Sequence, residues 1–190
     1  MTPPRAALDG ARLEVLSVTG ATLRSTEPFS RMLGDSADPG RTGDLAFVIM
    51  QIGNEELDRV YDHAIVPALR RCALEPRRAD RHTRGGLLHS EIIGFLESSE
   101  ILVADLTHER PNCYLEVGYA LGIGRFTNLI LMAREDHHPD HPSHRPRGPK
   151  VHFDLSGYDI LFWSPHRLAE LRSELEKRVR RHQLLLRADA

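Results

Sequence analysis

The stretch "ILVADLTHERPNCYLEVGYALGIG" (residues 101–124) places a short apolar run, a polar loop and a helical pattern in direct succession. The apolar run ends at Asp105 and has the length of a strand that is buried on both faces. A strand followed at once by a helix is typical of a parallel sheet covered by helices. Glu116 lies within the largely apolar helix, and its position there requires a physical reason.

The same alternation continues on both sides of this stretch. We expect helices over residues 55–72, 112–123 and 164–186, and a second helix that follows a Gly-Gly loop within residues 82–99. We expect a kink at Pro67, with Ser164 and Pro165 as N-cap and first residue of the last helix. We expect strands over residues 45–50, 74–80, 100–107, 128–133 and 158–163. Because parallel strands need right-handed crossovers, the pattern predicts a flavodoxin-like (Rossmann-like) three-layer α/β sandwich with a mostly parallel five-stranded sheet.

Residues 1–44 differ from the rest of the chain, since Ser, Pro, Gly and Asp are mixed there between short apolar segments. We interpret them as an N-terminal extension that precedes a domain over residues 45–187. The segment "LEVLSV" (residues 13–18) is either an extra strand or part of a poorly ordered lead-in.

Composition narrows the class of protein. The 190 residues carry 25 basic and 27 acidic side chains spread along the chain, so we expect neither nucleic acid nor a membrane as a partner. Cys72 and Cys113 lack the spacing of a disulfide framework or a zinc site, which predicts reduced packing residues. No apolar segment resembles a signal core or a membrane span, so we expect a cytoplasmic protein.

In a sheet of this kind, ligands bind outside the carboxyl ends of the strands, where the strand order reverses. That rule selects the loops after the first and third predicted strands, which contain Gln51, Gly53 and Asn54 in one and Asp105, Thr107, His108, Arg110 and Asn112 in the other. Asp105 would place a carboxylate on the floor of this crevice. The alternative is an aspartate that caps a helix or braces the loop.

Glu116 has neighbours at helical spacing that are mostly small or apolar, namely Cys113, Tyr119 and Ala120. If Asn112 caps the helix, Glu116 lies one position past the capping-box site, so capping does not explain it. Helical side chains lean toward the helix N-terminus, which here points to the crevice. A partly buried carboxylate facing the crevice is one interpretation, and an ordinary surface charge is the other.

Other polar groups are candidates for ligand contacts. Arg84, Gly85 and Gly86 precede the second predicted helix, where backbone N–H groups and a guanidinium suit a phosphate, although an ordinary loop is the alternative. Asp80 and His82 would contact a ribose or lie in a solvated turn. Four histidines, His137, His138, His141 and His144, lie in a Pro-rich segment that we interpret as a mobile, solvated loop, and we predict no metal site.

Three segments together resemble one family. "FVIMQIGNEELDRVYDHAIVPAL", "ADLTHERPNCYLEVGYALGIGRFTNLILM" and "FDLSGYDILFW" are similar to the nucleoside 2-deoxyribosyltransferase-like family, a relative of TIR-like domains, over residues 45–180. The resemblance implies that Glu116 attacks or stabilises the anomeric carbon of a ribosyl or deoxyribosyl group. It further implies that Asp105 holds the sugar or orients the base, and that Asn112 matches the asparagine of the motif.

The implied function is an N-glycosidase or (deoxy)ribosyltransferase that needs no cofactor. A carboxylate suits this chemistry because cleavage of an N-glycosidic bond builds positive charge on the sugar. The implied ligand is a nucleoside, a nucleotide or an NAD-like molecule. Relatives of this fold often complete their sites across a dimer, which implies a homo-oligomer. Gln51 departs from the proline of many relatives. Two alternatives stay open: a TIR-like NAD-cleaving effector and a catalytically silent nucleotide-binding sensor.

Overall fold

The computed structural model describes residues 44–81, 88–145 and 147–188. The N-terminal extension with its predicted strand, and the predicted phosphate site at Arg84, Gly85 and Gly86, lie outside these residues. His82 lies outside them too. The predictions made for those segments therefore stay predictions.

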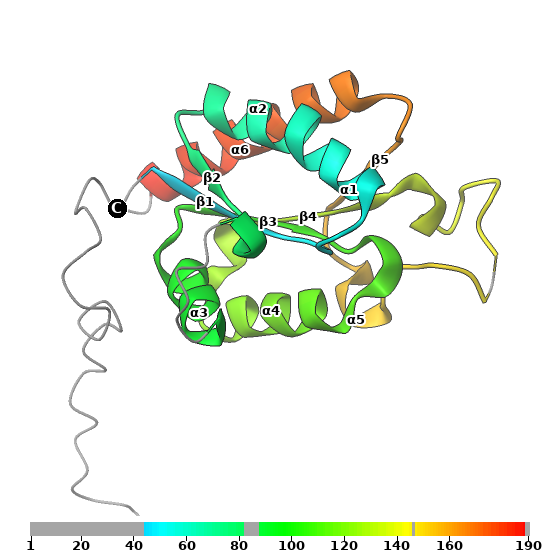
Figure 1. Ribbon diagram of the computed structural model, residues 1–190, viewed down its shortest axis with the longest axis horizontal. Helices are drawn as coiled ribbons and strands as arrows, with labels where there is room; N and C mark the ends of the chain where they lie inside the picture. Colours follow the sequence, from blue (N-terminus) through cyan, green and yellow to red (C-terminus); the bar gives the residue numbers. More distant parts are fainter. Residues whose placement is uncertain (1–43, 82–87, 146, 189–190) are drawn as a thin grey trace, which may run out of the picture. The chain divides into compact units, whose positions relative to one another are not determined.

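A five-stranded, fully parallel sheet forms the centre of the described domain, in the order β2-β1-β3-β4-β5 (Figure 1). This arrangement confirms the predicted flavodoxin-like class. The strand order reverses between β1 and β3, which are paired with Val48 opposite Val103. The strands are β1 (Leu45–Ile49), β2 (Glu75–Arg77), β3 (Ile101–Asp105), β4 (Leu129–Arg134) and β5 (Ile160–Trp163).

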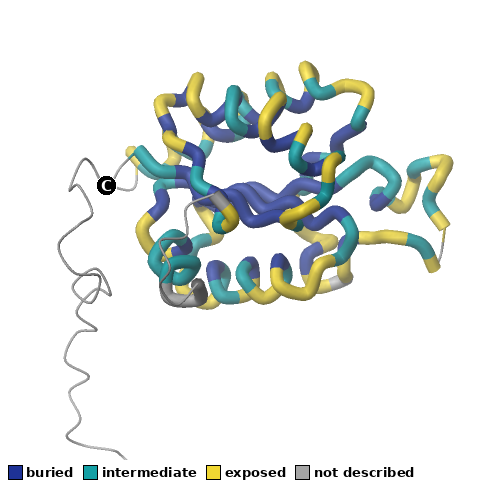
Figure 2. Tube along the Cα trace, viewed as in Figure 1, coloured by how far each residue is buried: buried dark blue, intermediate teal, exposed yellow. Residues whose placement is uncertain are grey.

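Helices cover the sheet on both faces (Figure 1). One face carries α1 (Glu55–Val60), α2 (Val66–Arg71) and α6 (Leu168–Ala188), and the other carries α3 (Leu88–Ser98), α4 (Pro111–Gly122) and α5 (Phe153–Ser156). Successive residues of a strand point to opposite faces of the sheet, so each strand contributes side chains to two apolar clusters. Val48 and Val103 pack in the cluster with α6, whereas Phe47 and Leu102 pack in the cluster with α4. The strands are accordingly the most deeply buried part of the domain (Figure 2).

The first predicted helix is interrupted by a π-helical segment, Tyr61–Ile65, between α1 and α2. Pro67 explains it, because its ring crowds the carbonyl of His63, four residues earlier, and it has no N–H to donate. The kink predicted at Pro67 is therefore a widened turn directly before the proline.

Two predicted helix starts are wrong. The last helix begins at Leu168, because Ser164 is buried and its carbonyl accepts a hydrogen bond from the Arg167 N–H at 3.1 Å, forming a turn first. The fourth helix, α4, begins at Pro111, so its N-cap is Arg110 with an extended backbone and not Asn112. A residue before proline is driven away from helical backbone angles, which fixes Arg110 outside the helix.

Cys72 and Cys113 are free and buried, as the sequence predicts. None of the helices in the described ranges combines the length and apolar character needed to cross a bilayer.

Candidate active site

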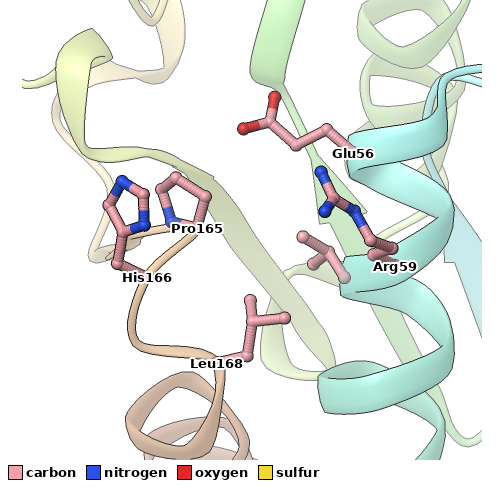
Figure 3. Close-up of a pocket in the computed structure, with 6 residues that line it drawn as sticks. Glu56, Arg59, Pro165, His166 and Leu168 are labelled. Carbon is pink, nitrogen blue, oxygen red and sulfur yellow. The ribbon is translucent and has the colours of Figure 1, made fainter.

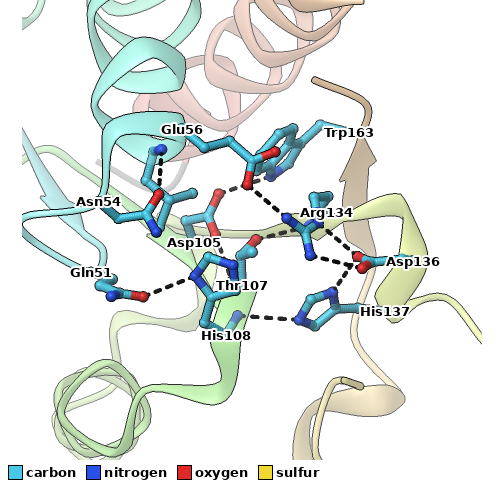
Figure 4. A network of polar contacts seen from close by, with 11 residues as sticks. Gln51, Asn54, Glu56, Asp105, Thr107, His108, Arg134, Asp136, His137 and Trp163 are labelled. Carbon is cyan, nitrogen blue, oxygen red and sulfur yellow. Dashed lines mark hydrogen bonds and ion pairs between the residues drawn. The ribbon is translucent and has the colours of Figure 1, made fainter. Parts of the chain in front are cut away.

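The loops after β1 and β3 meet at the point where the strand order reverses. Gln51, which follows β1, and His108, which follows β3, form a hydrogen bond of 2.9 Å between Oε1 and Nδ1 (Figure 4). Because a carbonyl oxygen only accepts, His108 donates through Nδ1–H and its Nε2 carries the lone pair. Both side chains are partly exposed, so this pair lies at the surface of the crevice.

The other predicted contacts in the β1 loop have structural roles. Gly53 has a φ of +76°, a left-handed conformation that favours glycine and turns the chain into α1. Asn54 is the N-cap of α1, and its Oδ1 accepts a hydrogen bond from the Leu57 N–H at 3.0 Å. Of these three candidates, Gln51 is the one whose side chain reaches across to the neighbouring loop.

Asp105 is fully buried at the end of β3, and protein donors occupy both of its carboxylate oxygens. Oδ1 accepts from the Thr107 N–H and Oδ2 accepts from the indole N–H of Trp163, each at 2.8 Å. Burial raises the pKa of Asp105, although these hydrogen bonds work in the opposite direction. The structure thus agrees with the loop-bracing alternative, because the carboxylate is buried and protein donors occupy both of its oxygens.

The loop after Asp105 has an unusual backbone. His108 and Glu109 both have left-handed angles, with φ of 67° and 50°, in a chain segment without glycine. The His108 N–H donates to Nε2 of His137 at 3.2 Å, and the Arg134 N–H donates to Oγ1 of Thr107 at 2.9 Å. Such backbone angles cost free energy and persist where surrounding contacts hold them, often at functional sites.

Arg134, the last residue of β4, connects this loop to α1. Its guanidinium contacts both carboxylate oxygens of Asp136, at 2.9 and 2.8 Å, and Oε2 of Glu56 at 2.6 Å (Figure 4). Burial of Asp136 acts to raise its pKa, but hydrogen bonds from Arg134 and His137 outweigh burial and bring the pKa to about 2. Asp136 is therefore an ionised anchor of the network.

His137 departs from the solvated loop predicted for the histidine-rich segment. Its ring is buried, and Nδ1 lies 2.8 Å from Oδ1 of Asp136. Since Nε2 accepts from the His108 N–H, Nδ1 carries the proton that Asp136 accepts. His137 thus bridges the carboxylate of Asp136 and the backbone N–H of His108.

Glu116 is half-buried on α4 and has no hydrogen bond or ion pair with any described residue. Removal from water raises its pKa to about 7. Glu116 shares a flank of the helix with Asn112 and Tyr119, four residues before and three after it. The Tyr119 hydroxyl donates to Oε1 of Glu97 on α3 at 2.6 Å, so this flank faces α3. Asn112 is exposed at the second position of the helix, one turn nearer the strand ends.

Glu116 and Asp105 lie on opposite faces of the sheet. Ile101 and Val103 pack in the same apolar cluster as Trp163, and Asp105 continues their alternation along β3. Glu116 belongs to α4, whose residues pack in the other cluster. The structure therefore does not bring these two predicted catalytic carboxylates together as a pair on one side of a crevice.

Asp80 neutralises a buried cation. Its two carboxylate oxygens each lie 2.7 Å from the guanidinium of Arg78, whose side chain is 2% exposed. Arg78 also contacts Asp58 at 2.8 Å and lies 4.4 Å from the centroid of the Tyr61 ring. This bidentate pairing commits Asp80 to Arg78, which differs from the predicted ribose contact or solvated turn.

A pocket of about 130 Å³ lies between α1 and the loop before α6 (Figure 3). None of the candidate site residues from the sequence lines it. A nucleoside-sized ligand needs roughly 300 Å³ or more, so this pocket alone does not accommodate one. Its lining consists of Glu56, Arg59, Val60, Pro165, His166 and Leu168.

The family stays an inference from motifs. Comparison with protein-family models, with curated proteins and with solved structures finds no significant match. The resemblance to the nucleoside 2-deoxyribosyltransferase-like family therefore enters the functional argument as a proposal. Within residues 44–81, 88–145 and 147–188, no three potential metal-binding side chains of His, Cys, Asp or Glu lie close enough to share an ion.

Sequence reasoning missed several members of the polar network at the strand ends, although it had a rule that reaches two of them. Arg134 and Trp163 are the last residues of β4 and β5, where the same strand-end rule applies. Glu56 carries no comparable signal, because its partner Arg134 is 78 residues away. Asp136 contacts its near neighbours Arg134 and His137, but the link from His137 to the His108 N–H spans 29 residues.

Proposed function

We propose that this protein cleaves or exchanges the N-glycosidic bond of a nucleoside or nucleotide, with Glu116 as nucleophile or as stabiliser of the sugar cation. One observation carries the proposal: Glu116 is a partly buried carboxylate without a partner among the described residues, and its pKa is raised to about 7. Glutamate is rarely withdrawn from water without a partner or a task. The resemblance of the surrounding motif supports the same assignment.

The proposed reaction depends on Glu116 having no cationic partner of its own. As the bond between the anomeric carbon and the base breaks, its electron pair leaves with the base and positive charge develops on the sugar. An unpaired carboxylate gains most when that charge appears, because neither water nor a protein cation neutralises it beforehand. In the covalent variant, a carboxylate oxygen of Glu116 bonds to the anomeric carbon, and water or an acceptor base then displaces it.

Asn112 has a supporting position in this proposal. It precedes Glu116 by four residues on the same helix, so the two side chains lie on one flank. Its exposed amide offers both a donor and an acceptor to a sugar or base. We assign Asn112 to ligand binding, and we place the activity in a homo-oligomer, as the resemblance implies. We place it in the cytoplasm because the sequence shows no segment like a signal core or a membrane span.

A mass-spectrometric screen tests the proposed function. Purified protein is incubated with nucleosides, nucleoside 5′-monophosphates and NAD, each with and without a second base as acceptor. Free base, or an exchanged nucleoside, that forms with the wild type and not with Glu116→Gln supports the proposal. Release of nicotinamide from NAD alone would indicate an NAD-cleaving effector instead. Tight binding without any product would indicate a nucleotide sensor.

A further inference from the structure

Among the described residues, two side chains of the loop from Asp105 to Arg110 keep an open hydrogen-bond acceptor, Glu109 through Oε2 and His108 through Nε2, and the polar network fixes the ring of His108. Both oxygens of Asp105 are occupied, and the hydroxyl oxygen of Thr107 accepts from Arg134. Oε1 of Glu109 lies 3.1 Å from Nε2 of His152. Arg110 offers only donors. Nε2 of His108 has no partner among the described residues.

The network holds His108 in one orientation and one tautomer. Gln51 accepts from Nδ1–H at 2.9 Å, which places the free lone pair on Nε2 (Figure 4). His137 accepts the backbone N–H of His108 at 3.2 Å and helps to hold its left-handed backbone. Burial, with the nearby charge of Arg134, lowers the pKa of His108, so the ring is neutral near pH 7.

We propose that His108 binds the sugar of the ligand, with Nε2 accepting a hydrogen bond from a ribose hydroxyl. This inference rests on the proposed function and names a contact for the same site. The resemblance implies that Asp105 holds the sugar, but both of its oxygens already accept hydrogen bonds from protein donors. His108 lies three residues further along the same loop and has a free acceptor within the part of the chain that the structure describes. A neutral imidazole nitrogen is suited to an O–H donor, and a fixed side chain loses little freedom when it binds.

The test combines variants with matched ligands. The ligands are nucleoside 5′-monophosphates in three sugar forms. The ribo form carries both the 2′- and the 3′-hydroxyl, the 2′-deoxy form carries only the 3′-hydroxyl, and the 3′-deoxy form carries only the 2′-hydroxyl. His108→Asn is the main variant, because asparagine tolerates a left-handed backbone, and His108→Gly is the second. Gln51→Met removes the acceptor that fixes the tautomer. His63→Asn, at an exposed position on the π-helical segment, is the matched control.

We expect His108→Asn and His108→Gly to lower kcat/KM by roughly 3- to 10-fold for ligands that carry the contacted hydroxyl. The ligand that lacks it should lose less than about 2-fold, because the contact is already absent. Gln51→Met should show the same pattern more weakly, and His63→Asn should match the wild type. The form that is insensitive to the variants identifies the hydroxyl.

The failures of the two proposals are distinguishable. Equal losses on all three sugar forms, with turnover still dependent on Glu116, would overturn the contact at His108 and leave the proposed function intact. If nothing is turned over, dissociation constants measured by calorimetry for the same ligands replace kcat/KM. Binding that shows the hydroxyl-dependent pattern without turnover would overturn the enzymatic function and support the contact. No binding of any monophosphate would overturn both.

Discussion

The indole N–H of Trp163, at the end of β5, donates a buried hydrogen bond of 2.8 Å to Oδ2 of Asp105, at the end of β3. Because β4 lies between these strands, the bond connects two strand ends that are not neighbours in the sheet. It holds Asp105 on the face of α6, away from α4 and Glu116. Of the two carboxylates, Asp105 is occupied by protein donors, whereas Glu116 has no partner among the described residues.

Asp105→Asn should lower stability and affect turnover only through loss of folded protein. An asparagine amide has one oxygen, so its NH₂ group must face either the Thr107 N–H or the Trp163 indole N–H, and one buried donor loses its partner. We expect a loss of about 1–3 kcal/mol in the free energy of unfolding, measured by urea denaturation. Trp163→Phe removes the same bond, and the double variant should lose less than the sum. Normal stability with impaired ligand binding would restore the sugar-holding role.

Glu116→Gln should abolish most turnover while the protein stays folded. The amide keeps the shape but not the charge that opposes the sugar cation, a contact that contributes about 3 kcal/mol to lowering the barrier. We expect kcat to fall at least roughly 100-fold with ligand binding largely retained. Glu97→Gln, on the neighbouring helix α3, is the matched control and should retain its activity. Comparable kcat values for Glu116→Gln and the wild type would exclude Glu116 from the chemistry.

The rate should rise with pH around neutrality. The proposed mechanism uses the ionised form of Glu116, and burial raises its pKa to about 7, so the reactive fraction grows as the pH passes through that value. We expect kcat/KM to increase by about 10-fold between pH 6 and pH 8, since one ionisation controls it. A rate that instead falls over this range would indicate that Glu116 acts as a proton donor.

Glu116→Gln should also stabilise the protein at alkaline pH. The pKa of Glu116 in the folded protein, about 7, exceeds its ordinary value of 4.5, so the folded state binds a proton more tightly than the unfolded state. Wild-type stability therefore falls as the pH rises from about 4.5 to 7, and the variant lacks this loss. After allowance for partial exposure, we expect the variant to be about 1–2 kcal/mol more stable at pH 8 and nearly unchanged at pH 5, measured by chemical denaturation.

Asp136→Asn should show the opposite dependence on pH. The folded-state pKa of Asp136, about 2, lies below its ordinary value of 3.8, so its contribution is present at neutral pH and is lost as the pH falls toward 2. We expect the variant to lose about 1–2 kcal/mol at pH 7 and less at pH 3. Asp140→Asn, an exposed aspartate in the same segment, should change little. A loss that does not depend on pH would assign the effect to packing.

The sequence by itself determined the parallel sheet and the position of Glu116. The continuous apolar runs ending at Met50 and Asp105, and the helical spacing between them, are local patterns with one physical solution. A glutamate among Cys113, Tyr119 and Ala120 also signals partial burial from its neighbours alone. These inferences depend on residues within a few positions of one another, which is why they hold without coordinates.

Only the tertiary structure decided the role of each polar group at the strand ends. Asp105 is bound by Trp163, 58 residues away, and Arg134 by Glu56, 78 residues away. The tautomer of His108 depends on Gln51, 57 residues earlier in the chain. A carboxylate or imidazole is chemically the same in the sequence whether its lone pairs are occupied or open. Its availability for a ligand is set by which strand ends the fold brings beside it.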